Sequence, residues 1–77
     1  MITVEYKKDG HGQRCWEVSG ADLRTQGLLL DAIPRCRLSG LDRVINIRRR
    51  AMGATEDESV ASITARVLAL AQSLART

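Results

Sequence analysis

An unusual concentration of arginine lies in the middle of the chain. Between residues 35 and 50 there are six arginines and one acidic residue, whereas the remaining sequence carries six basic and eight acidic residues. A guanidinium group is planar and binds phosphate or carboxylate through two hydrogen bonds at once. The sequence therefore predicts one local anion-binding region, and its candidate partner-binding residues are Arg35, Arg37, Arg43, Arg48, Arg49 and Arg50.

A second stretch with chemical potential is KKDGHGQRCW, residues 7–16, which contains the only histidine, the only tryptophan and one of the two cysteines. A histidine beside a thiol can act in nucleophilic catalysis. Here a strand that turns Trp16 inward turns Cys15 to the opposite face, while His11 falls in the preceding turn. Because nothing aligns His11 and Cys15 as base and nucleophile, we expect no catalytic residue and no enzymatic activity.

Metal and cofactor sites also lack their usual patterns. The spacing of Cys15 and Cys36 fits no zinc knuckle, and the glycines around His11 match no phosphate-binding motif. The acidic run at residues 56–58 is explained by the start of a helix. We expect no bound metal and no cofactor.

The type of anion is constrained by the aromatic residues and by two acids. Proteins that bind single-stranded nucleic acid on a sheet stack bases on exposed aromatic rings, but Tyr6 and Trp16 are both expected in the core. No polar recognition helix follows a short helix and a tight turn, as duplex readers require. Glu5 and Glu17 share the expected outer face with the arginines, so cross-strand pairing with them could also leave an ordinary solvated surface.

The first element expected to position these residues is a hairpin over residues 2–18. Both ITVEYK and RCWEV alternate apolar and polar residues, and DGHG between them is a turn signal. The apolar side chains share one side of the sheet only if the loop has an odd number of residues. A three-residue loop, Asp9 to His11, closed by Lys8 and Gly12, meets this condition. It predicts Val4 opposite Trp16 and Ile2 opposite Val18.

Residues 20–33 are predicted to form a helix. Ser19 or Asp22 can cap its start, and Pro34 ends it. Its buried side is expected to contain Leu23, Leu30 and Ile33, with Leu29 or Gly27.

Residues 41–50, LDRVINIRRR, fit two elements. The β-branched run VINI favours a strand with Ile45 and Ile47 inward. Arg48 and Arg50 would then project from one face, about 7 Å apart. A helix is the alternative, because Ser39 and Asp42 have capping-box spacing and Gly53 could end it.

A final helix is predicted over residues 56–75. Thr55 and Glu58 have the spacing of a capping box. Apolar residues then recur at steps of three and four: Val60, Ile63, Val67, Leu70 and Leu74. This seam could pack on the protein's own sheet or contribute to a dimer interface.

These elements predict one α+β domain, residues 1–77, in the order β-β-α-β-α. An antiparallel hairpin and a third strand would form the sheet, with both helices packed on one face. No signal peptide and no apolar run of membrane-spanning length is present. We therefore expect a cytoplasmic protein with Cys15 and Cys36 reduced, although a disulfide between them is an open alternative.

Our functional hypothesis is a small non-enzymatic protein-binding module. Small proteins without catalytic residues are common products of bacteriophages and mobile elements, among them anti-CRISPR-like and antitoxin-like inhibitors of host complexes. The arginine-rich strand and the loop PRCRLSG would occupy an acidic or phosphate-lined surface of a larger protein or nucleoprotein complex. The alternative is a dimeric DNA- or RNA-binding protein. No membrane partner is expected, and the protein could be a monomer or a homodimer.

Overall fold

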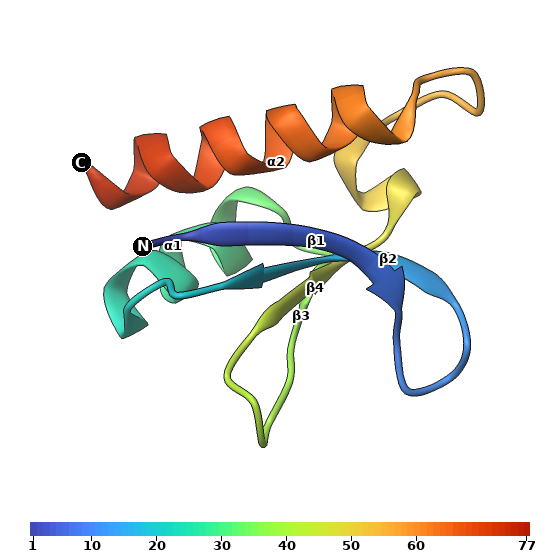
Figure 1. The fold of residues 1–77 in the computed structure, drawn as a ribbon. Coiled ribbons are helices and arrows are strands. Elements are labelled where there is room, and N and C mark those ends of the chain that lie inside the picture. The colour runs from blue at the N-terminus through green and yellow to red at the C-terminus, as the bar shows by residue number, and fades with distance from the viewer.

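A computed structural model describes all residues, 1–77, and shows one four-stranded sheet with two helices (Figure 1). The strands pair antiparallel in the order β1-β2-β4-β3, so the predicted α+β fold is confirmed. The elements in chain order are β1 (Thr3–Lys8), β2 (Arg14–Ser19), α1 (Leu23–Ala32), β3 (Arg37–Leu38), β4 (Ile45–Ile47), the 3₁₀ helix η1 (Arg49–Met52) and α2 (Val60–Ala75).

The hairpin of β1 and β2 has the predicted parity but a longer loop. Val4 faces Val18 and Tyr6 faces Trp16, so the predicted pairing of Val4 with Trp16 is wrong by two residues. The loop spans residues 9–13 because Asp9 organises all five of them. Its carboxylate accepts hydrogen bonds from the backbone N–H groups of His11 and Gln13, and its own N–H donates to the carbonyl of Gln13.

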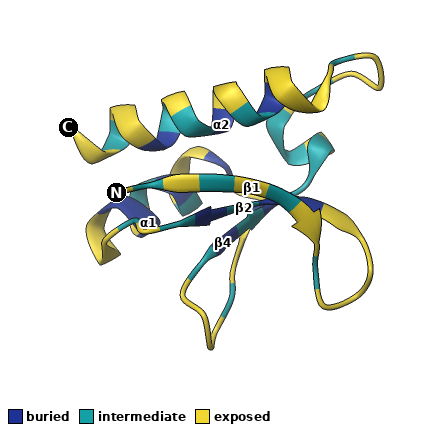
Figure 2. Ribbon diagram, in the orientation of Figure 1, coloured by how far each residue is buried: buried dark blue, intermediate teal, exposed yellow.

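The core lies between one face of the sheet and both helices (Figure 2). Trp16 and Val18 of β2 and Ile45 and Ile47 of β4 are the buried side chains of the sheet. The helices contribute Leu29, Ile33, Ile63, Val67 and Ala71 to the same cluster. The expectation that both helices cover one face is therefore confirmed, and the opposite face of the sheet carries no helix.

Helix α1 begins after Asp22, whose carboxylate accepts from the N–H of Thr25, so one of the two predicted caps is confirmed. Its buried face differs from the prediction. Leu23 is 68% exposed, while Gln26 is buried and donates to the carbonyl oxygens of Ala21 and Arg43. These bonds fix the rotation of the helix, which brings Leu29 inward and leaves Leu23 in solvent.

The segment 41–50 forms a strand over only three of its residues, Ile45–Ile47. Ile45 and Ile47 point inward as predicted, but the chain leaves the sheet after Arg48 and forms η1, which ends at Gly53 with a positive φ of 65°. Arg48 and Arg50 therefore do not project from one strand. The sequence prediction also missed β3, which pairs Arg37 with Asn46.

Helix α2 starts four residues later than predicted. Ser59 caps it by accepting from the N–H of Ser62 at 3.0 Å, so the capping box of Thr55 and Glu58 is wrong. The physical reason is Arg49, whose guanidinium donates to the carbonyl oxygens of both Thr55 and Glu58 and holds this segment as a turn. The predicted seam packs on the protein's own sheet except at its first residue: Ile63 and Val67 are buried there, Leu70 and Leu74 are partly buried, and Val60 is exposed.

The cap assignment can be tested with two matched substitutions. Ser59→Ala should lower the free energy of unfolding by about 1 kcal/mol, because it leaves an N–H group of the first turn without a partner. Thr55→Ala should change stability by less than about 0.5 kcal/mol, since the side chain is exposed and caps nothing. Urea unfolding followed by circular dichroism measures both, and a larger loss for Thr55→Ala would contradict the assignment.

Candidate binding groove

The helix-free outer face of the sheet brings arginines from separate segments together. Arg37 faces Asn46 across β3 and β4, whereas Arg35 lies in the turn that leads into β3. The backbone of Arg48 is still extended, with φ −91° and ψ 158°. Because side chains two residues apart in an extended chain share a face, Arg48 lies on the outer side together with Asn46 and Arg37.

An open groove with a volume of about 1190 Å³ lies between the β1–β2 loop and the segment from Pro34 to Ser39. We call it the arginine groove, and it is lined by Arg35, Arg37, Arg48 and Arg50. His11 and Gln13 contribute from the loop, and Asn46 from β4. The only acidic side chain in the lining is that of Asp9.

Asp9 neutralises one arginine of the groove and fixes its position. Its Oδ2 lies 2.7 Å from Nη2 of Arg48, while Oδ1 accepts from the N–H groups of His11 and Gln13. The backbone bonds from Gln13 and His11, with a smaller contribution from Arg48, lower the pKa of Asp9 below 3.8. The carboxylate therefore stays charged and keeps Arg48 in the groove at neutral pH.

The other three arginines of the groove have no partner within the protein. The side chains of Arg35, Arg37 and Arg50 make no hydrogen bond or ion pair with other residues, and all three residues are exposed. Their donors are satisfied by solvent and can be transferred to an anionic ligand without breaking an internal contact. The groove thus combines one fixed guanidinium with three free ones.

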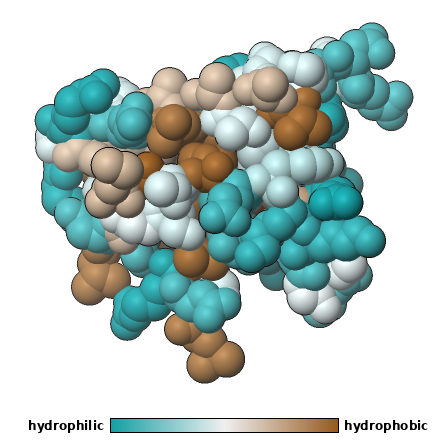
Figure 3. Space-filling view, in the orientation of Figure 1, coloured by the Kyte–Doolittle hydropathy of each residue, from teal (hydrophilic) through white to brown (hydrophobic).

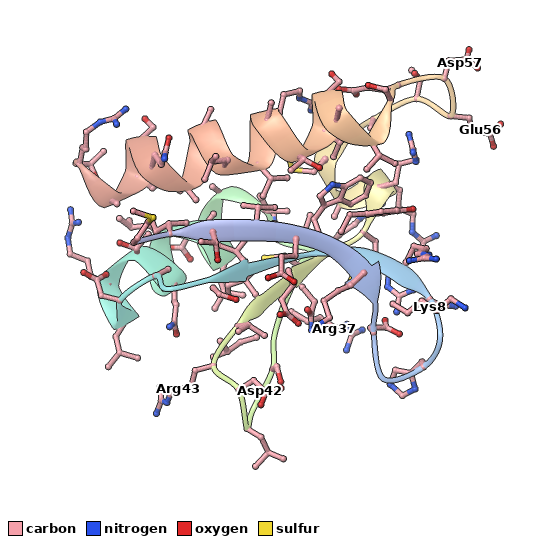
Figure 4. All side chains as sticks on the ribbon, in the orientation of Figure 1. Lys8, Arg37, Asp42, Arg43, Glu56 and Asp57 are labelled. Carbon is pink, nitrogen blue, oxygen red and sulfur yellow. The ribbon has the colours of Figure 1, made fainter.

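Two of the six predicted arginines lie elsewhere. Arg43 lies in the turn between β3 and β4 and points away from Arg37 (Figure 4). Its φ of 52° reflects the tight turn. Arg49 is partly buried, bonded to the carbonyls of Thr55 and Glu58, with its guanidinium carbon 5.8 Å from the centre of the Trp16 ring. Its role in the fold leaves it few donors for a ligand.

Sequence reasoning missed residues that the fold adds to this surface. A smaller hollow of about 430 Å³ adjoins the arginine groove and shares Gln13, Arg48 and Arg50 with it. Arg14 lines this second hollow, as does one acid, Glu56. His11 is exposed in the turn, as expected, and it also lines the groove. One signal in the sequence bears on Arg14. The alternation of RCWEV places it on the same face of the strand as Trp16, and therefore not on the outer face.

The aromatic rings are positioned for packing. Trp16 is 1% exposed, and its Nε1 donates to the Thr64 hydroxyl at 2.8 Å. Tyr6 stacks on Trp16 with ring centres 4.6 Å apart, and the Arg14 guanidinium lies over the Tyr6 ring. The expectation that Trp16 is buried is confirmed, and a base has no open indole face on which to stack.

Two carboxylates flank the arginines on the outer face. Glu5 lies directly opposite Glu17 across β1 and β2, which is an unfavourable pairing of like charges. Lys7 offsets it, with its Nζ 3.7 Å from Glu17. Since no arginine forms an ion pair with either glutamate, the alternative in which Glu5 and Glu17 neutralise the cluster by direct pairing is not observed.

The two cysteines are free thiols in buried positions. Cys36 belongs to the core cluster, whereas Cys15 lies on the outer side near the Asn46 side chain. Burial raises the pKa of both thiols. No group of three His, Cys, Asp or Glu side chains is arranged to hold a metal ion, and neither helix has the length and apolar character needed to cross a bilayer.

The lowered pKa values predict how stability depends on pH. Asp9, Asp22 and Glu58 all have folded-state pKa values below their ordinary values of 3.8, 3.8 and 4.5, caused chiefly by the N–H groups of Gln13 and Thr25 and by Arg66, respectively. A group that binds its proton more weakly in the folded state stabilises the protein above its unfolded pKa. Stability should therefore fall as the pH decreases below about 4.5 and through these lowered values.

Asp9→Asn isolates the contribution of the groove to this pH dependence. At pH 7 the variant should be less stable than the wild type, because the ion pair with Arg48 is lost. Its stability should also decline less steeply in acid. Urea unfolding at a series of pH values measures both effects, and a decline of unchanged slope would show that Asp9 does not titrate as described.

Comparison of the chain with protein-family models, with curated proteins and with solved structures gave no match.

Proposed function

We propose that the protein is a small non-enzymatic binding module that attaches to an acidic surface of a larger protein or nucleoprotein complex through the arginine groove. One observation carries this proposal: four arginines converge on one groove, and its single acid, Asp9, neutralises only Arg48. A free guanidinium group binds a carboxylate through two parallel hydrogen bonds, which fix its orientation. An inhibitor that blocks a host complex, of the anti-CRISPR-like or antitoxin-like type, would act in this way.

The surroundings of the groove favour a compact acidic surface over a long nucleic acid. Glu5 and Glu17 lie on the same outer face as Arg37 and Arg48, so a phosphate backbone that continued across the sheet would meet like charge. Trp16 offers no ring for base stacking, which is a main source of affinity for single strands. Carboxylates confined to the corner of β3 and β4 avoid both obstacles.

A second candidate function is direct DNA or RNA binding. It is favoured by the second hollow, where Arg14 extends the positive surface beyond the arginine groove. Such binding would weaken with salt by about 0.7–0.9 log units per log unit of salt for each phosphate neutralised. The salt dependence alone does not distinguish this candidate from the first proposal, so the experiment also compares peptide and DNA probes.

The experiment uses fluorescence anisotropy with three labelled probes of equal charge: an oligoglutamate peptide, a DNA duplex and a single-stranded DNA. We expect the wild type to bind the peptide more tightly than either DNA. The triple variant R35A/R37A/R50A should lose most of this binding. The control R24A/R43A/R76A removes the same charge at exposed positions outside the groove and should keep it. Equal loss in both triples would contradict a localised site, and tighter binding of DNA would support the second candidate.

A further inference from the structure

Strand β1 forms an open edge of the sheet. The sheet order places β1 at one end and β3 at the other. Apart from its ladder to β2, the backbone of residues 3–8 takes part in no hydrogen bond with any other segment. With six residues and no proline or bulge, β1 is long enough to pair with another strand, and such an edge readily does so.

The hydrogen-bond pattern of the hairpin shows which backbone groups of β1 are free. The N–H of Asp9 donates to the carbonyl of Gln13, which faces it across the hairpin. Bonded and non-bonded pairs alternate along an antiparallel ladder, so Lys7 and Glu5 use their backbone groups on β2. The N–H and C=O groups of Val4, Tyr6 and Lys8 therefore point away from β2 and are the ones a new strand would bind.

An apolar seam runs beside this edge on the helix side. Ile2, Val4 and Tyr6 are only partly buried, as are Leu70 and Leu74 of α2. Figure 3 shows apolar atoms exposed along the line where α2 passes over β1. A strand added to β1 would cover part of this seam, so the edge offers apolar contact as well as free backbone groups.

We propose that β1 pairs antiparallel with β1 of a second copy of this chain, in the register centred on Tyr6, so that the sheet continues from one protomer into the next. The free backbone groups restrict pairing to registers that bring the even-numbered residues together. In the register centred on Tyr6, Glu5 of each protomer lies opposite Lys7 of the other. Registers centred on Glu5 or on Lys7 would set like charges against each other.

The charge pattern of β1 thus makes it complementary to itself. Glu5 and Lys7 are both exposed on the outer face, and two attractive pairs form for each dimer. On the helix side the same register sets the two Tyr6 rings side by side, a favourable cross-strand contact. The arginine groove lies between the β1–β2 loop and the segment that leads into β3, and none of residues 3–8 lines it. Pairing along β1 would therefore leave the groove open, and the inference does not depend on the proposed function.

Sedimentation equilibrium from micromolar to millimolar protein tests the pairing. We expect the wild type to dimerise as its concentration rises. Glu5→Lys and Lys7→Glu should each weaken the dimer roughly tenfold or more, because every cross-strand charge pair becomes repulsive. An equimolar mixture of the two variants should form a heterodimer at least as tight as the wild type. In that mixture one chain carries lysine at both positions and the other carries glutamate at both, so every cross-strand pair is attractive.

Two controls keep the result unambiguous. Glu56→Lys and Arg43→Glu make the same kinds of charge change in loops remote from β1 and should leave dimerisation unchanged. Amide exchange gives a second readout: the N–H groups of Tyr6 and Lys8 should become protected as concentration rises, whereas those of Glu5 and Lys7 are protected throughout. A monomer at all concentrations, or a mixture of variants that fails to associate, would overturn the proposal.

Discussion

Trp16→Ala is expected to lower the free energy of unfolding by about 3–5 kcal/mol, the largest loss from any single substitution in this chain. Trp16 is the largest fully buried side chain. Its removal leaves a cavity against Tyr6 and takes away the indole that bonds to Thr64 and lies beneath Arg49. A chain of 77 residues has a total stability of about 4–12 kcal/mol, so a large share of the molecules would be unfolded at the lower end of this range.

Urea unfolding followed by circular dichroism measures this loss. Trp16→Phe is the matched comparison, because it keeps an aromatic ring in the core and removes the indole N–H. It should cost clearly less than Trp16→Ala. If Trp16→Ala unfolded within about 1 kcal/mol of the wild type, the indole would not be the centre of the core, and the orientation of the whole β1–β2 hairpin would be wrong.

The double charge reversal R35E/R37E should reduce affinity for an oligoglutamate peptide about 100-fold, or about 2.7 kcal/mol. Neither side chain has a partner within the protein, so the substitutions break no internal contact. Each one replaces an attraction with a repulsion at an exposed site, where a charge pair contributes up to about 1 kcal/mol. The two reversals together therefore account for the expected loss.

The matched control for this prediction is R43E/R76E. Each Arg→Glu change removes two charges, so both double variants go from a formal net charge of +3 to −1. Arg43 and Arg76 are exposed but lie outside the groove, so the control should lose only the part of the affinity that depends on overall charge. Comparable losses in the two variants would mean that the peptide senses net charge alone.

The alternation of apolar and polar side chains predicted where the hairpin strands lie and which face is buried, but not how long their loop is. The alternating residues of ITVEY and RCWEV identified the buried face of the hairpin, and burial of Trp16 followed from it. The pairing was still wrong by two residues, because alternation specifies only whether the loop is odd or even. The five-residue loop depends on hydrogen bonds from the backbone to Asp9, which no periodic pattern reveals.

The arginine groove could be predicted only as a set of residues. The composition of residues 35–50 identified the cluster, but not which members would meet. Arg37 joins Arg48 on the outer face through β3, a strand of two residues that is too short to show a pattern in the sequence, and Arg35 lies in the turn before it. Arg49 is partly buried because it donates to two carbonyl oxygens just before α2. These contacts join residues outside any periodic pattern, and they also place the cap of that helix at Ser59.

The most direct test of the binding account is an NMR titration with the oligoglutamate peptide that follows the side-chain Nε–H signals of arginine. The account predicts that Arg35, Arg37, Arg48 and Arg50 shift together with one dissociation constant, while Arg24, Arg43 and Arg76 stay in place. Shifts spread evenly over all exposed arginines, or none at the groove, would contradict it.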